Sequence, residues 1–485
     1  MAIKKLPRIL LAAPASGSGK TAVTCGLLRL LWRKGEQPRA FKCGPDYIDP
    51  IFHTHVLDTP CRNIDTFFAH ESLARRLFEK SASQGTISVI EGVMGYYDGL
   101  GGTSLSASSW EAASVLETPV ILVINARGMS RSVAALLRGF LSYQENSRIR
   151  GVILNQVSEM TASMMKAVIE KETDVKVVGY VPVCREACME SRHLGLRLPE
   201  RAEELRRQID ALADVLEKTL DLEAILDLAR QAGPLPGTEG KQTDSEIAAS
   251  KTKSRLRIGI ARDEAFCFYY EDGLDLYRQM GAELVPFSPL RDGELPEGIS
   301  GLLLGGGYPE TAAAALADNA SMRHAVRRAV ESGMPCRAEC GGFLYLHRNL
   351  QGEDGNDYPM AGVIPARAYR SGKQSRFGYI TLEAAEDGRY LHRGELIRGH
   401  EFHHWDSEQC GASCTARKPV GQRVWPCMIQ KGNLLAGFPH IYDPAAPFLA
   451  HRFVKLCREY GKRERGKCHE RIQRDCPAGG QSSAI

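Results

Sequence analysis

The chain has 485 residues, of which 43% are hydrophobic and 25% are charged, and its formal net charge at pH 7 is +4. This composition is typical of a soluble globular protein with two or three domains. The near balance of basic and acidic residues gives no indication of a nucleic-acid partner. No apolar run approaches the ~18 residues that a membrane-spanning helix needs. We therefore expect neither a nucleic acid nor a membrane as a partner.

The first residues, "MAIKKLPRILLAAP", combine two lysines with a short apolar run, as a signal peptide does. The apolar run is too short for that role and leads straight into a glycine-rich loop, so we interpret it as a first strand and expect a cytoplasmic protein. In such a protein the fourteen cysteines predict reduced thiols rather than a disulfide framework.

Apolar runs then alternate with helical stretches, which predicts a parallel sheet flanked by helices over residues 1–231. The expected strands are "RILLAA", "ISVIEG", "PVILVIN", "RIRGVILNQV" and "VKVVGYVPV". Residues 232–254 are rich in Gly, Pro, Ser, Thr and charge and predict a linker. A second series of apolar runs predicts another α/β domain over 255–460. Residues 461–485 are charged and then Gly/Ser-rich, and we expect a disordered tail there.

The segment "APASGSGKTAVTCGLLRLLW" follows the first expected strand and opens a helix, which is the setting of a phosphate-binding loop. Gly17 and Gly19 let the backbone approach the phosphates, and amide groups at the helix N-terminus point at the anion. In this pattern Lys20 reaches the β- and γ-phosphate oxygens, and Thr21 ligates Mg²⁺. The usual pattern has glycine at position 14, where this chain has Pro14.

Four acidic residues fall at the ends of expected strands or in the loops after them. Asp46 and Asp49 lie in "KCGPDYIDP", Glu91 closes "ISVIEG", and Asp98 lies in "GYYDGL". In an open parallel sheet, ligands bind beyond the carboxyl ends of the strands. We therefore expect these acids to converge near the phosphate loop and to include ligands of a phosphate-bound Mg²⁺.

Cys340, in "RAECGGFLYL", follows an expected strand and precedes a helix-like run. Small neighbours at this position permit the sharp turn of a nucleophile elbow, and a helix N-terminus lowers the pKa of a thiol. The amides of Gly305 to Gly307 are candidate oxyanion donors. His440, in "AGFPHIYDP", is the candidate base. The alternative is that Cys340 is a buried structural thiol.

The segment "HEFHH" matches the zinc-protease pattern H-E-x-x-H, which requires a helix. Its surroundings are strand-like, and a strand would place the two histidines ~13 Å apart, too far for one metal ion. We therefore reject the metalloprotease interpretation.

Together, "SGSGKT", "KCGPDYIDP", "EGVMGYYDG", "SRHLGL", "LLLGGGYPE", "AECGG" and "GHEFHH" resemble the cobyrinate a,c-diamide synthases, glutamine-dependent amide-forming enzymes of cobalamin biosynthesis. The resemblance extends to about residue 460. It implies an α/β fold with an N-terminal P-loop domain similar to dethiobiotin synthetase and a C-terminal class I-like glutamine amidotransferase domain. It also implies ATP as co-substrate, Mg²⁺ as cofactor, and glutamine and a cobyrinate-type corrinoid as substrates. A homodimer is left open.

The resemblance assigns roles to individual residues. It implies that Cys340 attacks glutamine with His440 as base, and that amides of Gly306, Gly307 and Gly341 form the oxyanion site. It implies nucleotide contacts from Gly17, Ser18, Gly19, Lys20, Thr21 and Asn155, a phosphate and substrate site with Asp46, Asp49 and Asp98, and Mg²⁺ ligands Thr21, Asp46 and Glu91.

One departure concerns the third member of the cysteine–histidine site. Ordinary class I amidotransferases have glutamate two residues after the histidine, where this chain has Tyr442. Three alternatives also stay open. The same chemistry could act on hydrogenobyrinate or on a nickel tetrapyrrole, the chain could be a dethiobiotin-synthetase-like ATPase without amidotransfer, or it could be a nucleotide-switched partition-type protein.

Overall fold

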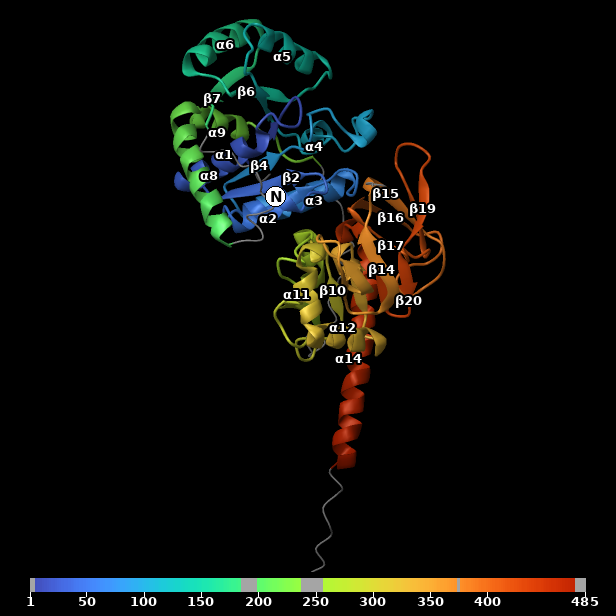
Figure 1. Cartoon of the computed structure of the whole chain (residues 1–485). Helices are drawn as coiled ribbons and strands as arrows, with labels where there is room; N and C mark the ends of the chain where they lie inside the picture. Colours follow the sequence, from blue (N-terminus) through green and yellow to red (C-terminus); the bar gives the residue numbers. More distant parts are fainter. Residues whose placement is uncertain (1–4, 185–198, 237–255, 373–375, 476–485) are drawn as a thin grey trace, which may run out of the picture. The chain divides into compact units, whose positions relative to one another are not determined.

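The structure is a computed structural model that describes residues 5–184, 199–236, 256–372 and 376–475. The chain divides into two compact units, Met1–Lys241 and Gln242–Ile485 (Figure 1). The expected linker over 232–254 contains this division, but only its residues 232–236 are described. No helix in the described ranges has the length and apolar character that crossing a membrane requires.

The first unit contains a seven-stranded sheet in the order β3-β2-β4-β1-β5-β6-β7, in which every neighbouring pair is parallel. The five expected strands are confirmed as β1, β4, β5, β6 and β7. The seven strands are β1 Arg8–Ala12, β2 Pro38–Cys43, β3 Cys61–Ile64, β4 Ile87–Glu91, β5 Val120–Asn125, β6 Ile149–Asn155 and β7 Lys176–Val181.

The central strands β1 and β4 are buried along their whole length, as expected for parallel strands covered on both faces. Apolar side chains of α1 and α8, which pack against each other, complete this core (Figure 1). The helices of this unit are α1 Lys20–Arg33, α2 Ile48–His55, α3 Glu71–Ala82, α4 Ser109–Val115, α5 Ser132–Ser142, α6 Glu159–Glu172, α8 Pro199–Thr219 and α9 Leu222–Arg230, with the short 3₁₀ helix η1 Leu100–Gly102.

The strand order places a crevice beside β1. β1 and β4 are neighbours in the sheet. The chain leaves β1 towards β2, which lies beyond β4, and leaves β4 towards β5, which lies beyond β1, so the two connections run in opposite directions. Connections that diverge in this way leave an opening at the carboxyl ends of the two strands, where ligands bind in open α/β sheets. The loop after β1 and the last residue of β4 therefore face the same opening.

The second unit is built on a six-stranded sheet in the order β20-β21-β11-β10-β8-β9, parallel except for the β20–β21 pair. Its strands are β8 Leu256–Ala261, β9 Ala282–Phe287, β10 Leu302–Leu304, β11 Cys336–Glu339, β20 Ile429–Lys431 and β21 Leu434–Gly437. Its helices are α10 Glu271–Gln279, α11 Ala313–Asp318, α12 Ala320–Glu331, α13 Gly341–Tyr345 and α14 Pro447–Asp475, with 3₁₀ helices η2 Pro309–Ala312 and η3 Asp443–Ala445.

Two smaller sheets belong to the same unit, in the orders β13-β12-β14-β17 and β19-β18-β15-β16-β22. Strand β16 contains the first part of "HEFHH", which confirms the strand interpretation and excludes the helical zinc-site geometry. The strands are β12 His347–Gln351, β13 Asp357–Pro359, β14 Ile364–Arg370, β15 Phe377–Ala384, β16 Leu396–Phe402, β17 Trp405–Ser407, β18 Cys414–Arg417, β19 Val424–Cys427 and β22 His440–Ile441.

The disordered tail expected from residue 461 is wrong for its first part, because helix α14 continues to Asp475. The segment "GKRERGKCHERIQRD" is charged, but Lys, Arg, Glu and Gln are good helix formers, so charge alone does not end a helix that is already nucleated. Residues 476–485 lie outside the described part of the chain.

Candidate active sites

The loop between β1 and α1 is held against the end of β6. Gly19 caps α1 with a φ of 89°, and a Cβ added there would lie 2.1 Å from Nδ2 of Asn155. The same Nδ2 donates a 2.9 Å hydrogen bond to the carbonyl of Ser18. Only glycine allows this close approach, so Asn155, expected as a nucleotide contact, braces the phosphate loop itself.

Lys20 is the first residue of α1 and is buried, although its side chain is charged. Its Nζ donates a 2.9 Å hydrogen bond to the carbonyl of Met94, in the loop after β4. Burial, and then the nearby charge of Lys42, lowers the pKa of Lys20 to about 8. The ammonium is thus held at the opening beside β1 with little solvent around it, which strengthens its attraction for an anion.

Glu91, the last residue of β4, is the centre of a fully buried charge cluster. Its Oε1 accepts a 2.5 Å hydrogen bond from the Thr21 hydroxyl and a 2.8 Å bond from Nζ of Lys42, and its Oε2 lies 3.1 Å from Nε2 of His53. Nζ of Lys42 also pairs with Asp49 at 2.6 Å. Burial alone would raise the pKa of Glu91, but the Lys42 charge and the His53 contact lower it below its ordinary value.

The four acidic residues expected at this site make different contacts. Glu91 and Asp49 share Lys42, as described. One carboxylate oxygen of Asp46 instead accepts the amide hydrogens of Ile48 and Asp49 at 2.8 and 3.2 Å, where α2 begins. Asp98 accepts the amide hydrogen of Gly95 at 2.8 Å, and its charge acts on Lys20.

The residues at this opening fit a Mg²⁺ ion bound together with nucleotide phosphates. The Thr21 hydroxyl and the Glu91 carboxylate are adjacent hard oxygen donors at the mouth of the loop. Mg²⁺ in nucleotide sites takes one or two carboxylates, phosphate oxygens and water rather than a complete protein cage. Consistently, no group of three or more His, Cys, Asp or Glu residues in the described ranges is arranged to hold a metal ion by itself.

Cys340 lies between β11 and α13 on a sharply bent backbone, with a φ of 48° and a ψ of −102°. A Cβ on Gly342 would lie 2.1 Å from the carbonyl of Leu304, so the turn closes only with glycine there. A non-glycine residue in this region of φ and ψ is strained, and such strain is concentrated at functional sites. The geometry is that of a nucleophile elbow.

His440 and Gly341, the residue after Cys340, both pack against the loop after β10. A Cβ on Gly306 would lie 2.5 Å from Cε1 of His440, and one on Gly341 would lie 2.9 Å from the Gly307 amide nitrogen. Burial and the charge of Glu310 raise the pKa of the Cys340 thiol, with the Gly341 amide acting in the opposite direction. Burial, and then the charge of His403, lowers the pKa of His440 to about 3. Burial thus favours the uncharged form of both the thiol and the imidazole.

The three glycines expected to form the oxyanion site, Gly306, Gly307 and Gly341, lie next to Cys340 or in the loop after β10. The carbonyl of Gly306 accepts the amide hydrogens of Cys267 and Phe268, both at 3.0 Å, which orients its peptide. Gly306 also forms an isolated antiparallel bridge with Phe268, which holds this loop in place. The Gly341 amide instead acts to lower the pKa of the Cys340 thiol, against the effect of burial.

A carboxylate that the sequence did not indicate lies next to His440. Oε2 of Glu339 is 4.0 Å from Nδ1 of His440, which is longer than a hydrogen bond. Burial raises the pKa of Glu339 to about 7, with Arg337 acting to lower it and Asp443 to raise it. Tyr442, which stands where other amidotransferases have glutamate, donates its hydroxyl to Asp272 at 2.9 Å.

Sequence reasoning therefore missed Lys42, His53 and Glu339. A polar residue near the carboxyl end of a parallel strand is the signal that could have found two of them, since Lys42 and Glu339 occupy such positions in β2 and β11. His53 lies within α2, and nothing in its local sequence distinguishes it from a packed core histidine.

Comparison with known families matches the two units separately. Residues 9–194 match a model described as the CobQ/CobB/MinD/ParA nucleotide binding domain. Residues 257–443 match a model described as the CobB/CobQ-like glutamine amidotransferase domain. The expected fold class, a P-loop parallel-sheet domain followed by an amidotransferase α/β domain, is confirmed.

Curated relatives align over almost their entire length. A cobyrinate a,c-diamide synthase from Caldanaerobacter subterraneus subsp. tengcongensis is 38% identical over 94% of this chain and 99% of its own. One from Listeria innocua serovar 6a is 40% identical over 90% of this chain and 96% of its own. With both domains matched in order, the chain belongs to the cobyrinate a,c-diamide synthase family.

Proposed function

We propose that this chain uses ATP and glutamine to amidate the a and c carboxylates of cobyrinate. The observation that carries the proposal is that a single chain combines a phosphate loop containing Lys20 with a strained turn that presents Cys340. A dethiobiotin-synthetase-like ATPase or a partition-type switch would leave the elbow and His440 without a role.

In the second unit, Cys340 is the nucleophile. Sγ bonds to the side-chain amide carbon of glutamine as the thiol proton passes to His440, and His440 returns a proton to the departing nitrogen. The products are ammonia and a glutamyl thioester, and water then hydrolyses the thioester to glutamate. The amides of Gly306 and Gly307 are the donors proposed for the oxygen that becomes negative in the tetrahedral intermediate.

In the first unit, a carboxylate of the corrinoid attacks the terminal phosphate of ATP, and ADP leaves. The resulting acyl phosphate has a good leaving group, so ammonia displaces phosphate and forms the amide. Lys20 neutralises charge on the transferring phosphoryl group. Thr21 and Glu91 are the proposed holders of Mg²⁺, which when bound supplies further charge neutralisation; Asp46, expected as a third ligand, stays a proposal.

The test of the function is product formation from cobyrinate, which should require ATP and glutamine or ammonia together. Hydrogenobyrinate and a nickel tetrapyrrole, assayed beside it, decide which macrocycle the chain accepts. ATP hydrolysis that is independent of both glutamine and every tetrapyrrole would instead favour an ATPase without amidotransfer. The proposal does not depend on whether the chain forms a homodimer.

We expect Glu339 to orient His440 and to give glutaminase activity a pH dependence. The carboxyl has a pKa of about 7, so it is protonated below that pH and charged above it. Only the charged form attracts the Nδ1 hydrogen of the imidazole, so kcat/KM for glutamine should rise with pH through about 7. Glu339→Gln should lose this rise and about tenfold in kcat/KM, since the charge that attracts and orients the imidazole is removed.

Ammonia-supported synthesis by Glu339→Gln should match the parent, since the second unit is not needed for it. Glu331→Gln, which removes an exposed carboxylate paired with Arg327 on α12, is the matched control and should change neither activity. An unchanged pH profile in Glu339→Gln contradicts the orienting role.

Glu91→Gln should raise the Mg²⁺ concentration needed for half-maximal ATP turnover, by about tenfold for a lost charged ligand contact. Asp46→Asn is the informative comparison, because an amide oxygen can still accept the two amide hydrogens at the start of α2. A raised Mg²⁺ requirement in Asp46→Asn supports its ligand role, and an unchanged one leaves Asp46 as a helix cap. Unchanged Mg²⁺ dependence in Glu91→Gln would remove Glu91 from the metal site.

A further inference from the structure

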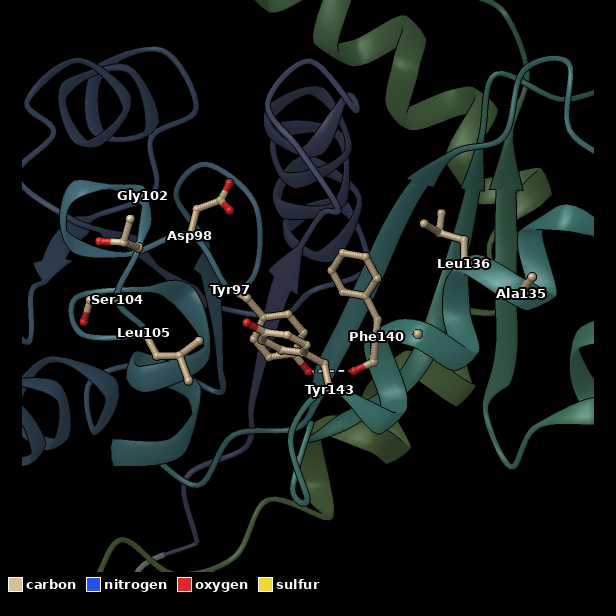
Figure 2. A pocket seen from close by; sticks show the side chains of 11 residues that line it. Tyr97, Asp98, Gly102, Ser104, Leu105, Ala135, Leu136, Phe140 and Tyr143 are labelled. Atoms are coloured by element: carbon tan, nitrogen blue, oxygen red, sulfur yellow. Dashed lines mark hydrogen bonds between the residues drawn. The ribbon is translucent and has the colours of Figure 1, made fainter.

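A cavity of about 780 Å³ lies in the first unit between the loop after β4 and helix α5 (Figure 2). Its size is that of pockets that hold drug-sized organic ligands. The walls come from two segments, the stretch from Tyr97 to Leu105 around η1 and one face of α5. The lining residues include Tyr97, Leu105, Leu136, Gly139, Phe140 and Tyr143.

Three aromatic rings form one wall of this cavity. The rings of Tyr97 and Phe140 are stacked, with centroids 5.5 Å apart and planes 25° apart, and the ring of Tyr143 lies 4.8 Å from that of Tyr97. The Tyr97 hydroxyl donates a 2.6 Å hydrogen bond to the carbonyl of Phe140, drawn as a dashed line in Figure 2, and this fixes the first ring. Tyr143 is 63% exposed, an unusual exposure for a large aromatic side chain in a folded unit.

The cavity adjoins the proposed phosphoryl-transfer site through Asp98. Asp98 lines the cavity, and a Cβ added to Gly95 would lie 2.5 Å from Oδ2 of Asp98 and 2.6 Å from the carbonyl of Pro14, in the loop after β1. The position of Asp98 is fixed by the hydrogen bond from the Gly95 amide, in the same loop that supplies the Met94 carbonyl to Lys20. A molecule seated on the aromatic wall can therefore extend a side arm past Asp98 towards the phosphate loop.

We propose that this cavity binds one edge of the tetrapyrrole substrate, with the macrocycle against Tyr97, Phe140 and Tyr143 and the reacting carboxylate arm directed towards Lys20. The assignment rests on the proposed function. A flat conjugated ring gains most from contact with aromatic faces, and Tyr143 offers such a face to solvent before substrate arrives. The hydroxyls of Thr103 and Ser104, also in the lining, are hydrogen-bond donors for a neighbouring peripheral carboxylate.

Gly139 provides a test that does not depend on removing packed side chains. It lies within α5 and lines the cavity, and a Cβ added there meets nothing within 4 Å. Gly139→Leu therefore adds a branched side chain to the cavity wall without a clash at its Cβ and, by replacing a helical glycine, is not expected to weaken the helix. Ser142→Leu adds the same side chain at an exposed position of the same helix, outside the cavity lining, and is the matched control.

With cobyrinate as the probe, Gly139→Leu should raise KM for the tetrapyrrole by more than tenfold, and Tyr143→Ala should raise it by about tenfold, the value of one aromatic contact. KM for ATP and glutaminase activity should stay at the parent's level in both variants and in Ser142→Leu. An unchanged tetrapyrrole KM in both variants, with an active parent, overturns the cavity assignment alone. A raised KM for ATP instead assigns the cavity to the nucleotide and also overturns it. A parent that amidates no tetrapyrrole overturns the proposed function and this inference with it.

Discussion

In the Cys340→Ser variant, glutamine-supported synthesis should fall by at least about 10³-fold, as when other enzymes lose their nucleophile. Ammonia-supported synthesis should stay at the parent's level, because added ammonia replaces the product of the second unit. The hydroxyl of serine is a far weaker nucleophile than a thiolate, and no thioester can form. The measurement is the ratio of ammonia-driven to glutamine-driven product at saturating ATP and cobyrinate.

Cys336→Ser is the control that separates this role from a structural one. Cys336 lies in the same strand, β11, and is fully buried. A buried hydroxyl without a partner costs roughly 1–3 kcal/mol, so Cys336→Ser should lower the free energy of unfolding of the second unit, and any loss of glutamine-supported synthesis should follow the loss of folded protein. If Cys340→Ser lost glutamine-supported synthesis only in proportion to such a loss of stability, Cys340 would be a structural thiol, and full glutamine-dependent activity would refute the amidotransferase assignment.

The second large effect is expected from Lys20→Ala. Synthesis from glutamine and from ammonia should both fall by about 10³-fold, since a cation aimed at developing phosphoryl charge is lost from a buried site. Glutamine hydrolysis should stay detectable, because it needs only the second unit. Initial rates of ADP release and of glutamate release, measured in the same reaction, distinguish a loss of phosphoryl transfer from a loss of glutamine hydrolysis.

Lys34→Ala is the appropriate comparison for Lys20→Ala. Lys34 lies at the other end of α1, is half exposed, and pairs with Glu217 on the surface. Exposed pairs of this kind contribute about 0–1 kcal/mol, so the variant should keep full activity. Equal ATP turnover by Lys20→Ala and the parent would remove Lys20 from the phosphate site.

The strands that could be predicted from the sequence are those with long apolar runs. β5 and β6 read as "VILVIN" and "IRGVILN", and their burial matches that pattern. β2 and β3, "PRAFKC" and "CRNI", carry charged or polar residues at positions that the sheet partly buries, so no periodicity marks them. The positions of β2 and β3 in the sheet depend on their pairing with each other and on the pairing of β2 with β4. These contacts join residues that are distant in the sequence, so a local pattern does not reveal them.

In the candidate sites too, sequence patterns predicted residues that lie within a local motif and missed residues that are defined by long-range contacts. Lys20 and Thr21 follow from a motif whose residues are adjacent, and Cys340 follows from its glycine neighbours. Lys42 bonds to Glu91, which is 49 positions away, and no local pattern expresses such a contact. Asp46 shows that a residue within a family signature can also accept backbone hydrogen bonds at the start of a helix, so its role as a metal ligand stays a proposal.

The positive φ of Cys340 also bears on how the stability of this fold relates to its activity. A non-glycine residue held in a sparsely populated backbone region costs about 1–3 kcal/mol, which the surrounding contacts of β11 and α13 must offset. Glycine at this position would relieve that cost and end the reaction with glutamine. The elbow is therefore a stability–activity trade-off at a single residue, where the side chain required for chemistry is one that the backbone conformation disfavours.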